Sequence, residues 1–367
     1  MKTMKERINT MIRILSGDCR KTLLELEDAS VQCCITSPPY WGLRDYGTAD
    51  WEGGEGDCDH LSDRTNYEKG FEGSKQATNK GTGNRDIIRH NVCPKCGAKR
   101  VDSQLGLEPT PEEYVENMVE VFRQVRRVLK DDGTLWLNLG DTYAGGASAG
   151  NKAFGNPEFN ENRPSRQATK TPQKTKPPNL KAKDIVGIPW RVAFALQADG
   201  WYLRQDIIWS KPNPMPESVT DRCTKAHEYL FLLAKQSKYY YDNQAVSEPA
   251  VYAGDDRGSR TDNRRDEPMC NSMSGVTGDT RNKRSVWTVT TKPYKDAHFA
   301  VFPTELITPC VLAGTKAGDV ILDPFGGSGT TGKVAIENGR RAILCELNPE
   351  YAELIEKRTT TTMGFGF

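Results

Sequence analysis

A glycine-rich loop between two short apolar segments near the C-terminus is the feature that most constrains the fold. Val320–Leu322 is of buried-strand type and leads into Asp323, and the loop at 324–331 follows directly. The next residues favour a helix that Gly339 can end, and a second apolar segment closes in Glu346. This order predicts a βαβ unit. Its tight glycine turn lets the backbone approach a ligand, and the acid after the second strand can hold the two hydroxyls of a ribose.

The same loop fits two other interpretations. Gly327 to Lys333 has the spacing of a phosphate-binding loop, but that loop needs Ser or Thr next to hold magnesium, and this chain has Val334. Asp323 would also repel a triphosphate. The remaining alternative is a glycine turn without a ligand. We favour a nucleoside-type ligand because strand, loop, helix and second acid occur in that order.

Composition sets the class of the chain. A length of 367 residues allows one large α/β domain or a domain with insertions. The net charge is +1, so any surface for nucleic acid must come from local clustering. The ten cysteines are scattered, and we see neither a secretory segment nor an apolar run long enough to cross a membrane. This pattern predicts a reduced, cytoplasmic protein.

A second motif lies near the N-terminus. Val31–Ile35 is a buried-type strand, and it runs directly into Thr36-Ser37-Pro38-Pro39-Tyr40-Trp41. Two prolines cannot continue a central strand, so the chain must turn out at the carboxyl end of that strand. In open α/β sheets, ligands bind at that edge.

Periodicity and caps predict the other core elements. A capping box with proline in the first turn starts a helix at Pro111, and Asp131–Gly133 ends it. Strands are expected at 134–139, 201–209 and 227–233, and a short helix at 189–198.

An irregular insertion at 44–107 carries a candidate metal site. The candidate ligands come in two pairs, Cys58 with His60 and Cys93 with Cys96. Glycine follows the second pair, as in a zinc knuckle. Four such ligands could hold a loop that has too few apolar residues to fold alone. The alternative is surface thiols beside a solvated histidine.

Two further polar segments bear on nucleic-acid binding. Residues 144–183 are basic and nearly devoid of aliphatic side chains, so we expect a flexible loop that contacts DNA or, alternatively, a solvated linker. Residues 242–297 mix arginines with acids, and we assign them as the candidate target-recognition region.

Together, the Ser-Pro-Pro-Tyr motif and the Asp323–Thr331 loop resemble one family closely. It is the group of DNA amino-methyltransferases that use S-adenosylmethionine, in the permuted order where the catalytic motif precedes the cofactor loop. The resemblance implies an α/β fold with a seven-stranded, mostly parallel, doubly wound sheet. The catalytic core would comprise residues 11–43, 108–143, 184–241 and 298–358.

The resemblance also implies which residues bind the cofactor. Asp323 would lie near the ammonium group, Glu346 would take the ribose hydroxyls, and Asp18 would meet the adenine amino group. Residues 298–304 would add further contacts. The full implied set is Asp18, Asp323, Phe325, Gly326, Gly327, Ser328, Gly329, Thr330 and Glu346.

The chemistry of an exocyclic amino group explains the Ser-Pro-Pro-Tyr motif. Its nitrogen is a poor nucleophile because the lone pair is delocalised into the ring. Ser37 Oγ and the Pro38 carbonyl can accept hydrogen bonds from its two N–H groups, which localises the lone pair on the nitrogen. Pro39 stiffens the turn, and Tyr40 offers a face on which the base can stack. The base must leave the duplex to reach them. No cysteine nucleophile is required.

The resemblance therefore implies a site-specific DNA methyltransferase that acts on double-stranded DNA in a prokaryotic or phage-infected host cell. It would act as a monomer or homodimer, with a cognate restriction endonuclease as a candidate partner. In this family, Ser at the first motif position goes mostly with cytosine N4 and Asp with adenine N6, so Ser37 favours cytosine N4 over the N6-adenine alternative. A remoter alternative is an inactive, zinc-bearing DNA-binding protein. A nucleotide triphosphatase is disfavoured by Val334.

Overall fold

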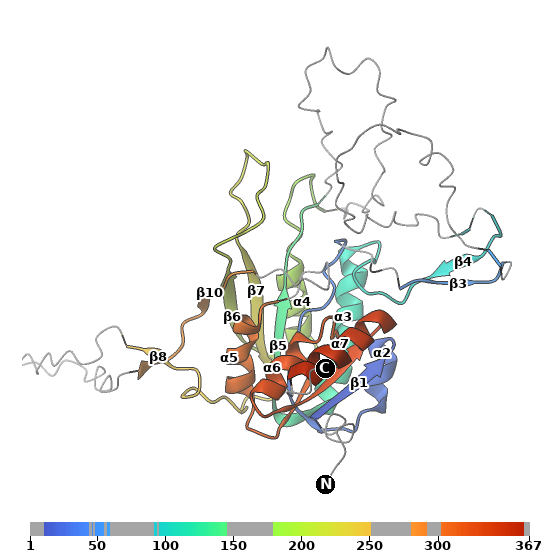
Figure 1. The fold of residues 1–367 in the computed structure, drawn as a ribbon. Coiled ribbons are helices and arrows are strands. Elements are labelled where there is room, and N and C mark those ends of the chain that lie inside the picture. The colour runs from blue at the N-terminus through green and yellow to red at the C-terminus, as the bar shows by residue number, and fades with distance from the viewer. Residues whose placement is uncertain are drawn as a thin grey trace, which may run out of the picture.

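The computed structural model describes residues 11–43, 46, 48–54, 57–58, 92–93, 95–144, 179–250, 280–291 and 302–362. In this part of the chain, one large sheet lies between two layers of helices (Figure 1). In spatial order its strands are β1 (Ile12–Ser16), β12 (Arg341–Glu346), β11 (Val320–Asp323), β2 (Val31–Thr36), β5 (Leu129–Leu139), β7 (His227–Ala234), β6 (Tyr202–Ser210) and β10 (Val286–Thr288). Among these eight strands only β7 runs antiparallel to its neighbours. The expected α/β fold with a mostly parallel sheet is confirmed.

The sheet has eight strands where seven were expected. The additional strand, β10, lies within the segment that we expected to take part in target recognition, and it pairs in parallel with β6. Its Trp287 is buried against Trp136, with 6.5 Å between the ring centroids. The strand is only three residues long, so no alternating pattern marks it in the sequence.

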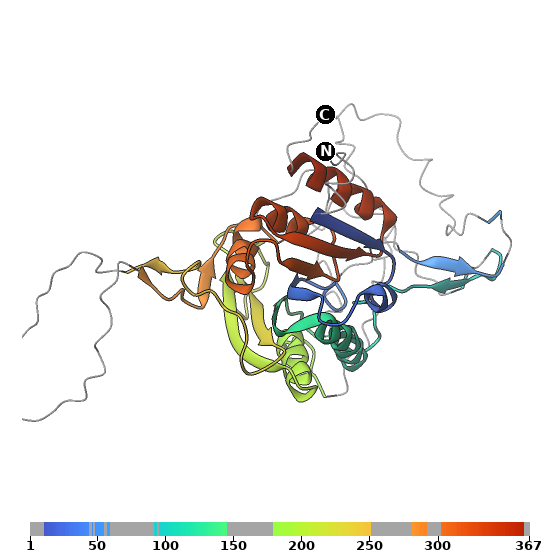
Figure 2. The ribbon, with the colours of Figure 1, turned by 90° about the horizontal axis from the view of Figure 1, so that it is seen from below.

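The two helical layers follow from alternation along the strands. One layer holds α2 (Cys19–Thr22), the 3-10 turn η1 (Leu23–Glu25), α3 (Pro111–Val128) and α4 (Ile188–Ala198); the other holds α5 (Thr304–Gly314), α6 (Thr330–Glu337) and α7 (Pro349–Thr362). On β2, Cys34 packs into the first layer, whereas Cys33 and Ile35 pack into the second. Figure 2 shows α3 and α4 on one side of the sheet and α5, α6 and α7 on the other.

Helix α3 starts as its sequence predicts, but the following strand begins earlier than expected. Thr110 caps the helix by accepting the Glu113 amide, and the helix ends at Val128. We predicted a strand over 134–139, and β5 instead starts at Leu129, which pairs with Val31. Asp131–Gly133, which were expected to end the helix, lie within β5. The pairing of β5 with β2 shifts register there, between Val31 and Cys33 of β2.

The strand ends place the two sequence motifs at one edge of the sheet. The parallel strands β2 and β11 are neighbours, so Ser37 and Pro324 each follow a carboxyl end at the same edge. Because β7 is antiparallel, its first residues lie at that edge too: Glu228 pairs with Trp209, next to the last residue of β6.

Two small antiparallel ladders project from this core. Strands β3 (Asp50–Glu52) and β4 (Lys99–Val101) form a hairpin-like pair beside α2 and α3, and β8 (Glu248–Pro249) pairs with β9 (Thr280–Arg281) on the opposite side (Figure 1). No helix in the described ranges is long and apolar enough to span a membrane.

Truncating a buried side chain of α3 should destabilise the fold. Met118→Ala removes a fully buried side chain between α3 and the sheet, and should lower the free energy of unfolding by about 2–5 kcal/mol. The matched control, Glu116→Ala, changes an exposed position of the same helix and should stay within about 0.5 kcal/mol of the parent. Urea unfolding followed by circular dichroism measures both; equal midpoints would contradict this packing.

Candidate active site

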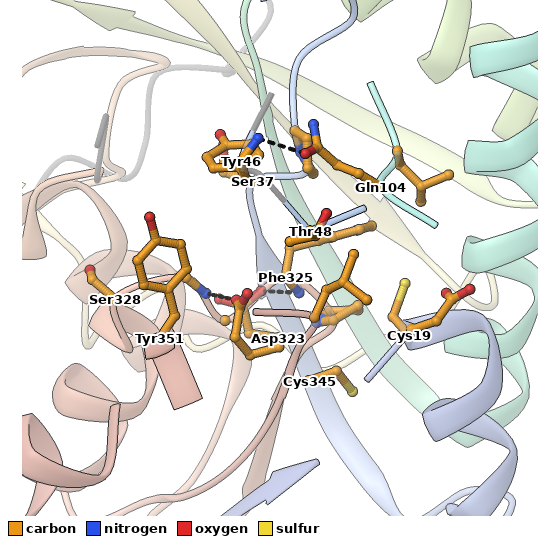
Figure 3. Close-up of a pocket in the computed structure, with 18 of the residues that line it drawn as sticks. Cys19, Ser37, Tyr46, Thr48, Gln104, Asp323, Phe325, Ser328, Cys345 and Tyr351 are labelled. Carbon is orange, nitrogen blue, oxygen red and sulfur yellow. Dashed lines mark hydrogen bonds between the residues drawn. The ribbon is translucent and has the colours of Figure 1, made fainter. Parts of the chain in front are cut away.

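A pocket lies along the carboxyl ends of β1, β2, β11 and β12. It is lined by residues from both sequence motifs and from the segments flanking β3 and β4, as Figure 3 shows for Ser37, Asp323, Phe325, Tyr46 and Gln104. Ten of the residues that the sequence singled out line it: Asp18, Ser37, Pro39, Asp323, Phe325, Gly326, Gly327, Ser328, Thr330 and Glu346. Pro38, Tyr40 and Gly329 are not among the lining residues.

The glycine loop makes a tight turn and directs the Gly327 amide at an acid. Gly327 and Gly329 have positive φ values of 52° and 76°, which favour glycine. The Gly327 amide donates to Glu346 Oε2 over 2.7 Å, and the Asn348 amide donates to Oε1 over 2.9 Å. Each carboxylate oxygen keeps a further lone pair, so Glu346 can still accept two hydroxyl groups.

Burial changes the titration of Glu346. Desolvation raises the pKa of its carboxyl from 4.5 to about 7, although the two backbone amides favour the ionised form. The side chain therefore takes up or releases a proton near neutral pH.

Asp323 joins the two motifs. Thr36 Oγ1 donates to its Oδ1 over 2.6 Å across 287 residues of sequence, and Thr331 Oγ1 donates to Oδ2 over 2.7 Å. The Phe325 amide adds a third bond of 3.0 Å. Desolvation raises the pKa of this buried carboxyl, and the three donors oppose that shift. Asp323 thus fixes the end of β2 against the glycine loop.

Asp18 and the loop hydroxyls have local partners. The Asp18 carboxylate caps α2 and forms a two-pronged ion pair with Arg20, at distances of 2.8–3.0 Å. From α7, Arg358 Nη1 donates to Ser328 Oγ and Thr330 Oγ1 over 2.9 and 3.0 Å. The side chains of these three predicted cofactor residues are therefore held in place by the protein itself.

The Ser-Pro-Pro-Tyr turn rests on a half-buried polar network. Ser37 Oγ donates to the Tyr40 hydroxyl over 3.4 Å, and the Tyr40 hydroxyl lies 2.7 Å from Glu228 Oε2 and 3.1 Å from Asn138 Oδ1. Glu228 also forms an ion pair with Lys211. Burial and the neighbouring Glu228 raise the pKa of Tyr40 well above its usual range, so its hydroxyl stays protonated.

Sequence reasoning assigned no role in the site to Glu228, Asn138 or Lys211. Glu228 was treated only as the start of an apolar strand, because a glutamate in that place has no signature of its own. Its significance comes from the reversed direction of β7, which brings the first residues of that strand to the ligand edge. Asn138 lies one residue before the end of β5 and is fixed beside the same network by a bond of 3.0 Å to the Tyr229 carbonyl.

The cysteines that line the pocket are not suited to attack a base. Burial raises the pKa of Cys345 to about 12 and also raises the pKa of Cys19. Both thiols stay protonated at neutral pH, whereas the nucleophile would be the thiolate. Val334, where a phosphate loop needs a hydroxyl, is buried in the core.

Comparison with known proteins identifies the family. The sequence model of a family described as DNA methylase matches residues 31–357. The chain belongs to this family of DNA methylases. It is 41% identical over 345 residues to the type II methyltransferase M.Cfr9I of Citrobacter freundii, covering 94% of this chain and 86% of that protein. It is 40% identical over 346 residues to M.SmaI of Serratia marcescens, covering 94% and 90%.

Solved structures share the fold of this DNA methylase. The PvuII DNA methyltransferase (cytosine-N4-specific) matches with a TM-score of 0.54 and 16% identity, over 96% of this chain and 92% of that one. TTHA0409 from Thermus thermophilus, complexed with S-adenosyl-L-methionine, matches with a TM-score of 0.50 and 21% identity, over 95% and 93%. The sheet and its helical layers are therefore those of this structural class.

Three of the four predicted metal ligands of the methylase lie together. The Sγ atoms of Cys58, Cys93 and Cys96 are all within 4.8 Å of one another, next to β3 and β4. His60 lies outside the described residues, as do most of the basic segment at 144–183 and much of 242–297. From the predicted contacts at 298–304, Phe302 lines the pocket, and 298–301 lie outside the described part.

The raised pKa of Glu346 predicts a pH-dependent stability. The folded state binds this proton more tightly than the unfolded chain, so the contribution is present below about pH 4.5 and is lost as the pH rises through about 7. The loss should amount to roughly 2–3 kcal/mol in the wild type and be absent in Glu346→Gln. Chemical unfolding at pH 5 and pH 8 measures it, with the exposed Glu350→Gln as the matched control. Parallel pH profiles of wild type and Glu346→Gln would contradict the shift.

Proposed function

We propose that this DNA methylase transfers a methyl group from S-adenosylmethionine to N4 of cytosine in double-stranded DNA. The observation that carries the proposal is the shared pocket. Ser37 and Pro39 line it together with the glycine loop and Glu346, and the Thr36–Asp323 hydrogen bond joins the two motifs. A base placed at Ser37 would thus lie beside a ligand held by the loop, as methyl transfer requires.

The pocket lining fits the proposed cofactor. Phe302, Phe325 and Leu347 offer apolar surface for a purine, and Glu346 has lone pairs left for two ribose hydroxyls. An added Cβ at Gly326 would lie 3.2 Å from the Cys345 carbonyl oxygen, so a larger residue would crowd the backbone of β12 at this turn. When bound, S-adenosylmethionine would supply a methyl group activated by its sulfonium. Transfer would leave a neutral thioether, and the base nitrogen that gains the methyl would lose one proton to solvent.

Ser37 and Pro38 prepare the base. An amino nitrogen conjugated to the ring becomes nucleophilic when acceptors bind both of its N–H groups and localise its lone pair. Ser37 Oγ and the Pro38 carbonyl are suitable acceptors. Tyr114 supports the turn, because its hydroxyl donates to the Pro39 carbonyl over 2.9 Å, and Trp41 Nε1 donates to the Glu108 carbonyl over 2.9 Å.

Glu228 sets the direction of the hydrogen bonds that reach Ser37. An ionised carboxylate can only accept hydrogen bonds, and Glu228 forms an ion pair with Lys211. The Tyr40 hydroxyl therefore donates to Glu228 and accepts from Ser37. Since Ser37 gives its only proton to Tyr40, its oxygen is left to act as an acceptor in the pocket that it lines. Glu228 is thus a positioning residue for the amino group of the base.

The choice of cytosine N4 rests on Ser37. In the family, serine at this position occurs mostly in enzymes that methylate N4 of cytosine, whereas aspartate occurs mostly in those that methylate N6 of adenine. The type II restriction–modification relatives also support a role in such a system, with a cognate endonuclease as partner.

Replacing Ser37 should abolish transfer but not cofactor binding. Ser37→Ala removes one of the two acceptors, and should lower kcat about 100-fold or more with little change in S-adenosylmethionine affinity. Tritiated methyl transfer to duplex DNA measures the rate, and calorimetry measures the affinity. Ser210→Ala, at the end of β6 and outside the pocket lining, is the matched control.

Nucleoside analysis of the methylated DNA tests the base. N4-methylcytosine is the expected product. N6-methyladenine as the sole product would overturn the cytosine assignment, and no transfer to any duplex by a cofactor-binding protein would overturn the proposed activity.

Replacing Glu228 should reverse the hydrogen-bond direction. The amide of Glu228→Gln can donate to Tyr40, so Tyr40 can donate to Ser37 and occupy one of its lone pairs. We expect kcat to fall about tenfold or more while KM for DNA and cofactor affinity stay near wild type. In a Tyr40→Phe background the same substitution should add little. The control is Glu217→Gln, because Glu217 pairs with Arg222 and not with Tyr40. Additive losses in the double variant would contradict the relay.

A further inference from the structure

The three clustered cysteines have the spacing of zinc ligands. Cys58 Sγ and Cys93 Sγ are 3.8 Å apart, far longer than a disulfide bond, and all three sulfurs lie within 4.8 Å of one another. A tetrahedral zinc with Zn–S distances of about 2.3 Å separates its sulfur ligands by about 3.8 Å. Thiolates are the ligands that zinc prefers in structural sites.

The local backbone is that of a metal knuckle. The Gly97 amide donates to the Cys93 carbonyl over 2.9 Å, and the Cys93 amide donates to the Ala98 carbonyl over 2.7 Å. Gly97 has a φ of 74°, which lets the chain turn directly after Cys96. Across the cluster, an added Cβ at Gly54 would lie 2.7 Å from Cys96 Sγ. The fold thus brings the β3 side close to the knuckle and keeps the space beside its sulfur clear.

The ladder of the hairpin is short. Strands β3 and β4 share three residue pairs, and a two-stranded ladder of that length is marginal in water. A bound metal adds folding free energy to such a unit, because its site does not exist in the unfolded chain.

Both strands of the hairpin lead into the wall of the cofactor pocket. Tyr46 and Thr48 precede β3, and Ser103, Gln104 and Leu105 follow β4; all five line the pocket. Figure 3 labels Tyr46, Thr48 and Gln104 among the lining residues.

Hydrogen bonds join the two halves of this wall and attach it to the core. The Tyr46 amide donates to Gln104 Oε1 over 2.7 Å, and Thr48 Oγ1 donates to Asp102 Oδ1 over 3.2 Å. Arg20 attaches the wall to α2 through the Ser103 carbonyl, at 3.2 Å. The register of the hairpin therefore sets the position of the pocket wall.

We propose that Cys58, Cys93 and Cys96 bind a structural zinc ion that fixes the β3–β4 hairpin, and through it the outer wall of the cofactor pocket. The three thiolates leave the fourth coordination position to another ligand. The metal takes no part in methyl transfer; it supports cofactor affinity. The effect of the metal on cofactor affinity rests on the proposed function, whereas the metal site itself does not.

Metal analysis of the full-length protein tests the site. Elemental analysis should find about one zinc per chain, released when a mercurial reagent titrates the thiolates. Cys96→Ser should lose the zinc, and Cys223→Ser, an exposed cysteine elsewhere in the chain, should keep it. After chelation, cobalt(II) should restore the site with a thiolate-to-metal absorption band in the near ultraviolet. Wild-type protein without zinc or without that band would overturn the site, even if Cys96→Ser does not fold.

Calorimetry with S-adenosylmethionine tests the coupling. Chelated wild type and Cys96→Ser should bind the cofactor roughly tenfold or more weakly, as expected for losing one or two wall hydrogen bonds, and zinc should restore the chelated wild type. Unchanged affinity after complete zinc loss would overturn the coupling. If the zinc-loaded wild type bound no S-adenosylmethionine, the proposed function would fail, and the metal measurements would still decide the site.

Discussion

The hydrogen bond between Thr36 and Asp323 is the constraint on which the site depends. A carboxylate buried at the end of a central strand is costly unless donors surround it, and here a threonine hydroxyl from each motif and one loop amide supply them. The ends of β2 and β11 cannot separate without leaving that carboxylate short of a donor. Two segments nearly three hundred residues apart are thereby fixed as the two sides of one pocket.

The antiparallel strand β7 brings further polar residues to the edge of the sheet where the pocket lies. Parallel strands present their last residues to a ligand, so they supply the turn at Ser37, the loop after Asp323 and the acid Glu346. Because β7 runs the other way, it presents its first residues, and Glu228 reaches Tyr40 from the opposite half of the sheet. The turn at Ser37 with its Tyr40–Glu228 contact and the glycine loop after Asp323 thus rest on different strands of one sheet.

The sequence predicted what depends on local order. The loop after Asp323, the turn at Ser37 and the cap of α3 each have a signature within about ten residues, and the family follows from two of them. Glu228, Tyr46 and Gln104 have no such signature, because their roles arise from strand direction and from contacts across 58 residues or more. The short strand β10 and the early start of β5 were not predicted for the same reason: they are defined by their pairing partners and not by local propensity.

The outer wall of the pocket has a practical consequence for building hybrid enzymes. Residues 44–107 look in the sequence like an appendage that could be exchanged between relatives without touching the catalytic core. Five of the residues around the cavity come from this stretch, however: Tyr46, Thr48, Ser103, Gln104 and Leu105. A graft of the whole segment would replace that side of the cavity, so a chimera that preserves it must place its junctions between Thr48 and Ser103.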